Sequence, residues 1–107
     1  MRKVNLAMAS EAIKDIIEAV IRERLSSDVV HKVVVTSDED ADGDAVLRVA
    51  VVLEGKHSDL DREKVVGLIR HLRSKLEDSE DRAAAQAFPI LSFMSKNEAK
   101  SLHLEAV

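Results

Sequence analysis

The chain has 107 residues, of which 46% are hydrophobic and 34% charged, and its formal net charge is -4. This length is typical of one domain, and the apolar fraction is sufficient for a folded core. We therefore expect a single domain over residues 1–107. The negative charge argues against broad electrostatic attraction to nucleic acid or anionic lipid, although a local basic face remains compatible with either partner.

Cysteine is absent, which excludes disulfides, thiolate nucleophiles and thiolate-bound metals. The three glycines are too far apart for a glycine-rich phosphate loop, and we expect no cofactor. No apolar run reaches the roughly 20 residues of a membrane-spanning helix. The apolar stretch before Glu11 is too short for a signal peptide. These features predict a cytoplasmic protein without membrane association.

The first predicted element is an amphipathic helix that ends near Leu25. Ser10 is placed to cap it, and Glu18 with Arg22 forms an i,i+4 pair. The apolar residues recur at helical spacing, and they are Ile13, Ile16, Ile17, Val20, Ile21 and Leu25.

Two β-branched runs follow, over residues 29–36 and 45–53, and both favour strands. Eight mostly polar residues separate them, so an antiparallel hairpin is expected. Alternation in the second run divides its side chains between two faces. One face has Leu47, Val49, Val51 and Leu53, and the other has Val46, Arg48, Ala50 and Val52.

A second helix is expected from Ser58 or Asp59 to about Glu77, with a buried stripe of Val65, Leu68, Ile69, Leu72 and Leu76. Residues 82–87 form either a short helix or an extension of it. Residues 88–94 predict a third strand, which Pro89 places at a sheet edge or at the beginning of the strand. A capping box of Ser95 and Glu98 then opens a C-terminal helix.

This order of elements, helix-strand-strand-helix-strand-helix, predicts an α+β fold. We expect a two-layer sandwich in which a three-stranded sheet has helices packed on one face. The uncovered face would be rich in valine, with Val30, Val34, Val46 and Val52 as candidate interface residues. Scattered exposed valines are equally compatible with this pattern.

The loop between the first two strands has four alternating aspartates, Asp38, Asp40, Asp42 and Asp44, around a glycine. This is the first half of a calcium-loop pattern, but Val49 stands where an EF-hand has its bidentate Glu, so the loop is not an EF-hand. One hypothesis is a different type of calcium or magnesium loop with these four ligands. The other is a charged hairpin tip, because Asp-Gly is a common turn pair.

The second helix has three candidate residues for binding a phosphate or an acidic partner, Arg70, His71 and Arg73. Arg70 and Arg73 share a helix face, but acidic residues lie on the same helix, so a solvated charged face is the alternative interpretation. The four histidines have neither metal-ligand nor catalytic-triad spacing. We therefore expect that the protein is not an enzyme.

The segment Gly67-Leu68-Ile69-Arg70-His71-Leu72-Arg73, followed by Leu76, resembles the Arg-His-Arg helix of BolA-like proteins. The order of elements is similar to that of type II KH-like proteins, which include the BolA-like branch. The resemblance implies that His71 corresponds to the family's helix histidine. It also implies glutaredoxin binding with a shared iron–sulfur cluster. The Gly-x-x-Gly loop that clamps RNA in KH domains is absent.

Together these features predict a non-enzymatic protein-interaction module that binds a second copy or another protein. The contact would use the apolar sheet face or an exposed strand edge. One alternative is a KH-like nucleic-acid-binding protein that uses the basic face of the second helix, although the net charge disfavours it. The other alternative is binding of a divalent cation at the acidic loop.

Overall fold

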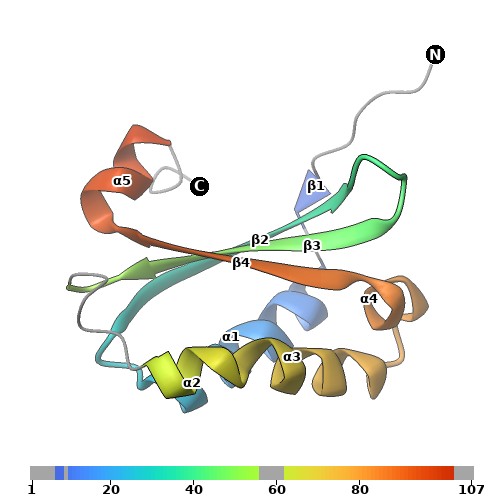
Figure 1. Cartoon of the computed structure of the whole chain (residues 1–107), viewed down its shortest axis with the longest axis horizontal. Helices are drawn as coiled ribbons and strands as arrows, with labels where there is room; N and C mark the ends of the chain where they lie inside the picture. Colours follow the sequence, from blue (N-terminus) through green and yellow to red (C-terminus); the bar gives the residue numbers. More distant parts are fainter. Residues whose placement is uncertain (1–6, 9, 56–61, 103–107) are drawn as a thin grey trace.

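A computed structural model describes residues 7–8, 10–55 and 62–102 (Figure 1). The strands β1 (Ala7–Met8), β2 (Val30–Glu39), β3 (Ala45–Leu53) and β4 (Phe88–Ser95) form one sheet in that spatial order. The helices in this part of the chain are α1 (Glu11–Leu25), α2 (Arg62–Val66), α3 (Leu68–Glu77), α4 (Arg82–Gln86) and α5 (Lys96–Ser101). The predicted α+β class and the order helix-strand-strand-helix-strand-helix are confirmed. The two-residue strand β1 was not expected.

Helix α1 has the ends that its sequence predicts. The Ser10 side chain accepts a hydrogen bond from the backbone N–H of Ile13, and Glu18 pairs with Arg22 at 2.9 Å. The helix ends at Leu25, and the φ of 79° at its C-terminal capping residue, Ser26, lies in the region that favours glycine. This backbone reversal directs the chain from α1 into β2.

Strands β2 and β3 form the predicted antiparallel hairpin, with Val35 opposite Val49. The alternation predicted for β3 is confirmed on the helix side, because Leu47, Val49, Val51 and Leu53 all belong to the main core. An irregularity lies between Val30 and Lys32, and it shifts the side-chain alternation of β2. Val30 therefore packs in the main core, and its expected place on the opposite face was wrong.

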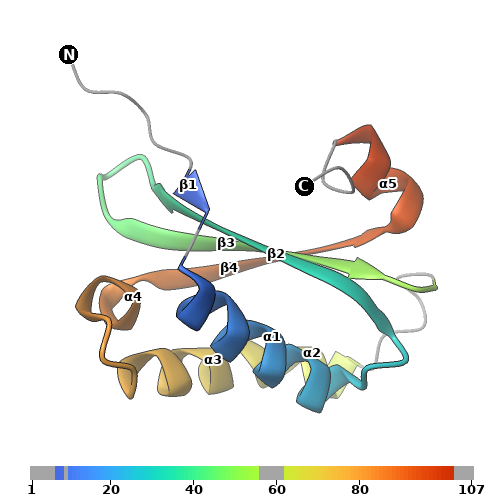
Figure 2. The ribbon, with the colours of Figure 1, turned by 180° about the vertical axis from the view of Figure 1, so that it is seen from behind.

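One layer of helices covers the core face of the sheet (Figures 1 and 2). Helix α3 contributes Leu68, Leu72 and Leu76, which are fully buried against α1 and the strands. The second predicted helix is divided at Gly67 into α2 and α3. A Cβ atom at this glycine would collide with the Arg24 guanidinium, which packs against its backbone. The expected start at Ser58 or Asp59 lies outside the described residues.

Strand β4 pairs in parallel with β3, with Leu91 beside Val49. The crossover connection that a parallel pair needs contains α2, α3 and the separate short helix α4. Pro89 occupies the second position of β4 at the edge of the sheet, as predicted.

Helix α5 lies on the opposite face of the sheet from α1 and α3 (Figures 1 and 2). Ser95 and Glu98 form the predicted capping box, and Ala99 packs on Val52 and Met94 in a small second core. The expectation that the helices share one face thus holds for α1 to α4 and not for α5. None of the described helices has the length and apolar character needed to cross a membrane.

Candidate functional site

The valines predicted for the uncovered sheet face are largely inaccessible. Val34 and Val46 are 5% and 4% exposed, and Val52 is completely buried in the core beneath α5. Val30 lies on the other side of the sheet. The described part of this face therefore offers no row of exposed valines to a partner.

The four aspartates of the hairpin do not form one cluster. Asp38 lies within β2, and its carboxylate accepts a hydrogen bond of 2.6 Å from Arg48 across the hairpin. This hydrogen bond is the main reason why the pKa of Asp38 lies below its ordinary value. Asp38 is thus held by Arg48, away from the loop where the other three aspartates converge.

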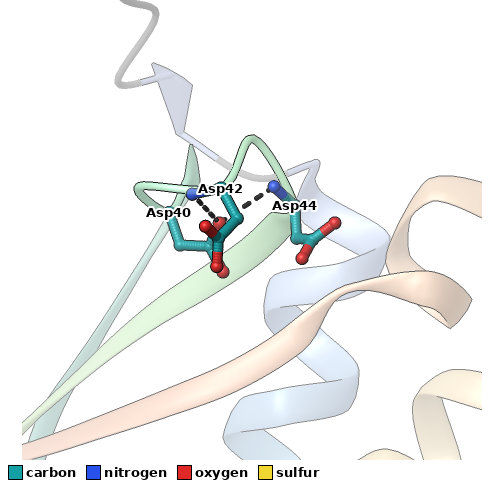
Figure 3. Close-up of side chains that lie close together, drawn as sticks. All are labelled: Asp40, Asp42 and Asp44. Carbon is teal, nitrogen blue, oxygen red and sulfur yellow. Dashed lines mark hydrogen bonds between the residues drawn. The ribbon is translucent and has the colours of Figure 1, made fainter.

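Asp40, Asp42 and Asp44 converge at the hairpin tip, where their carboxylate oxygens lie within 4.8 Å of one another (Figure 3). Asp40 Oδ1 accepts two hydrogen bonds of 2.9 Å from the backbone N–H groups of Asp42 and Asp44. Gly43 adopts a φ of 84°, which completes the turn. The same carboxylates could coordinate a hard cation, but one Asp40 oxygen already organises the loop backbone.

The three candidate residues of the basic helix do not all lie on one surface. Arg70 and Arg73 line a hollow on the outer side of α3, together with Val66 and Glu77. His71 lines a different hollow, between α3 and α1. Arg73 pairs with Glu77 at 3.7 Å and has its guanidinium 5.4 Å from the centre of the Phe88 ring.

A charged cluster that sequence patterns do not reveal joins the C-terminal ends of β3 and β4. The Glu54 carboxylate contacts Lys96 Nζ at 2.6 Å and His31 Nδ1 at 3.3 Å. The hydrogen bond from Lys96 is the largest cause of a lowered pKa of Glu54. These groups tie the start of α5 to the sheet.

The two edges of the sheet differ in their protection. The outer edge of β2 is occupied at one end by β1, which pairs with Thr36 and Ser37. Near the other end, Arg22 of α1 donates to the carbonyl oxygens of Val30 at 2.9 Å and His31 at 3.4 Å. Arg22 and β1 together reduce the number of unpaired backbone groups that the outer edge of β2 offers to another chain.

Strand β4 forms the other edge, and no strand in the described part of the chain pairs with its outer side. Its eight residues, Phe-Pro-Ile-Leu-Ser-Phe-Met-Ser, include no charged side chain. Natural edge strands are usually protected by charges, bulges, short length or a covering element. Within β4 only Pro89 serves this purpose, and Arg73 of α3 lies over the Phe88 ring at the start of the strand. The rest of the outer edge of β4 has no paired strand in the described sheet.

The geometry thus defines an α+β protein with a four-stranded mixed sheet, whose edge strand β4 has no partner on its outer side among the described residues. Comparison with protein-family models, curated proteins and solved structures finds no match for the chain. The resemblance to type II KH-like and BolA-like proteins therefore stays a prediction.

Proposed function

We propose that the protein is a non-enzymatic interaction module that forms a homodimer by pairing β4 with β4 of a second copy. The observation that carries this proposal is the uncharged eight-residue strand at an edge without a paired neighbour in the described residues. Strand addition would satisfy backbone N–H and C=O groups on its outer side. The two four-stranded sheets would become one continuous sheet.

The composition of β4 suits pairing with itself. In a two-fold symmetric contact, each residue of β4 is placed near other residues of the same strand. A strand with several charges of one sign would bring like charges together, which is destabilising. Because β4 has no charged side chain, pairing of β4 with its own copy brings no like charges together within the strands.

A two-fold axis perpendicular to the sheet keeps the helix-covered faces of the two copies on the same side. An odd-numbered residue of β4 then lies opposite an odd-numbered residue of the other β4, and an even-numbered residue opposite an even-numbered one. With the axis at Leu91, this residue opposes its own counterpart. Pro89 then opposes Phe93 on the helix side, where Leu91 and Phe93 already pack against the core. On the other side Ile90 opposes Ser92, and Phe88, whose ring reaches Arg73 of α3, opposes Met94. Apolar cross-strand neighbours therefore form along the helix side and at both ends of the contact.

The decisive experiment measures the mass of the protein in solution by sedimentation or light scattering. Ser92→Lys places two lysines diagonally across the axis, about 7–8 Å apart, and should convert dimers to monomers. Ser92 is exposed, so the fold should persist and can be checked by circular dichroism. Ala19→Lys on the exposed face of α1 adds the same charge away from β4 and should leave the dimer intact.

Two results would contradict the proposal. The first is a wild-type protein that remains monomeric up to about 1 mM, which limits the association free energy to weaker than about -4 kcal/mol. The second is a dimer that Ser92→Lys leaves unchanged.

A second candidate function is divalent-cation binding at the hairpin tip, supported by the convergence of Asp40, Asp42 and Asp44. Calorimetric titration with calcium or magnesium tests it. Binding heat that disappears in Asp42→Asn would support a cation site, whereas no heat at millimolar metal would reject it. Asp42→Asn is informative because the two hydrogen bonds to Asp40 Oδ1 use backbone N–H groups and survive the substitution.

A further inference from the structure

We infer that α5 is a detachable cover over one end of the second sheet face, held closed by the ion pair between Glu54 and Lys96. The cover opens while the main core stays folded, and its opening uncovers the apolar side chains beneath it. This property belongs to the single chain and does not depend on pairing of β4.

Helix α5 is held in place by a small contact. It has six residues, and a helix of this length does not persist in water without packing against other elements. Ala99 is its buried residue, and it packs on Val52 and Met94 in the small second core. No residue of α5 belongs to the main core. Helix α5 can therefore leave the sheet without loss of the main core.

The ion pair joins the first residue of α5 to the residue that follows β3. Lys96 Nζ lies 2.6 Å from Glu54 Oε1, and His31 Nδ1 of β2 lies 3.3 Å from Glu54 Oε2. The side chains of Glu54 and Lys96 are 43% and 45% exposed. Water and salt screen such a pair, so it holds α5 only weakly.

The hinge of the cover is Ser95, the last residue of β4, which is followed directly by α5. The Ser95 hydroxyl accepts a hydrogen bond from the backbone N–H of Glu98, and the Glu98 carboxylate accepts one from the backbone N–H of Ser95. Both bonds lie within residues 95–98. Helix α5 can thus turn away from the sheet at Ser95 while its capped first turn stays intact.

Opening changes the second face of the sheet at the end where α5 lies (Figures 1 and 2). Val52 and Met94 are buried beneath the closed helix, and Ala50 beside them is partly buried. These three side chains form an apolar surface once α5 has left. An apolar partner of this surface would have to displace α5 first.

Cysteine labelling measures the opening, because the chain has no natural cysteine. Val52→Cys places a thiol of similar size beneath α5. Val51→Cys is the matched control, because the preceding residue of β3 is equally buried but lies in the main core. Under native conditions Val52→Cys should react with a thiol reagent at least about tenfold faster than Val51→Cys. Urea midpoints correct both rates for differences in global stability.

Glu54→Gln tests the ion pair, because it removes the charge without altering α5. It should raise the labelling rate of Val52→Cys by about two- to fivefold, and about 1 M salt should abolish this difference. The rate of Val51→Cys should not change. Asp38→Asn is the control, since it removes an ion pair with Arg48 near the hairpin tip and should affect both labelling rates equally.

Two results would count against this inference. Equal corrected rates for Val52→Cys and Val51→Cys would show that α5 opens only when the whole chain unfolds, and would overturn the cover. Fast labelling of Val52→Cys that neither Glu54→Gln nor salt changes would overturn the role of the ion pair. Both readouts are independent of the mass measurements that test β4 pairing.

Discussion

The guanidinium of Arg22 donates a hydrogen bond of 2.9 Å to the carbonyl oxygen of Val30, and this bond joins the last turn of α1 to the outer edge of β2. A cation thus occupies a backbone acceptor that an approaching strand would otherwise use. The Arg22 side chain is 29% exposed, so the interaction is only partly screened by water.

Replacing Arg22 with alanine should lower the free energy of unfolding by about 1–2 kcal/mol, because hydrogen bonds from a charged donor to two carbonyl groups are lost. Glu18→Gln is the matched control. It removes only the ion pair and should cost about 0.5 kcal/mol. Urea unfolding monitored by circular dichroism measures both values, and equal losses would show that the carbonyl contacts are unimportant.

Ser26→Gly should stabilise the protein by about 1 kcal/mol, because glycine adopts the positive φ of this position without steric strain. The hydrogen bond lost from Asp28 N to Ser26 Oγ is long, at 3.3 Å, and exposed. Ser26→Ala removes the same hydroxyl without relieving the strain, so it should not stabilise. Thermal unfolding of the two variants decides the matter, and a lower melting temperature for Ser26→Gly would contradict the argument.

Acid should destabilise the fold partly through Asp38, whose pKa in the folded protein is lowered mainly by the hydrogen bond from Arg48. A carboxyl with a lowered folded pKa stabilises the folded state above its unfolded pKa, and this contribution is lost as the pH falls through the folded pKa. The loss should therefore begin near the ordinary value of 3.8 and increase below it. Glu54, whose pKa is lowered chiefly by Lys96, acts in the same direction.

Urea midpoints measured between neutral pH and pH 3 test this expectation. Asp38→Asn should be less stable at neutral pH and should show a flatter decline on acidification. A decline identical to that of the wild type would exclude Asp38 as a contributor.

Asp40→Ala should destabilise the hairpin by about 1 kcal/mol, since two backbone N–H groups lose their shared acceptor. Asp42→Ala also removes one negative charge but leaves those bonds in place, so it should be neutral or slightly stabilising. Amide hydrogen exchange at Asp42 and Asp44 gives the local measurement. Unchanged exchange rates in Asp40→Ala would show that this carboxylate does not organise the loop.

Sequence periodicity predicted most of the helices and strands because their burial follows regular spacing. The stripe of Leu68, Leu72 and Leu76 repeats every four residues and is fully buried, as expected. Ile69 belongs to the same predicted stripe but lies half-buried on the outer face of α3. Hydrophobicity alone does not show where the boundary of a buried helix face lies.

The remaining differences come from tertiary contacts that local patterns do not contain. The shift between Val30 and Lys32 reverses the face of Val30, and no residue type in this valine-rich run marks it. The break at Gly67 coincides with the packing of Arg24 from α1, more than 40 positions earlier in the sequence. Helix α5 covers one end of the second face through Ala99, whose small side chain gives little indication of burial.

The candidate sites were likewise predictable only where they depend on local sequence, and not where they depend on tertiary contacts. Alternating aspartates were visible in the sequence, but the removal of Asp38 from the cluster depends on Arg48 across the hairpin. The accessibility of β4 depends on its position at the end of the strand order, which follows from the parallel crossover and not from the residues of β4 themselves.

Under the proposed β4 pairing, the unequal protection of the two sheet edges would also limit the size of the assembly. If two copies pair through β4, both ends of the combined sheet are the β2 sides, where β1 and Arg22 occupy part of the β2 edge. A further copy would then meet the β2 side of the sheet instead of an equivalent strand, so the proposed pairing predicts a dimer and no larger species. A sheet with both edges open would instead allow end-to-end polymerisation into fibres.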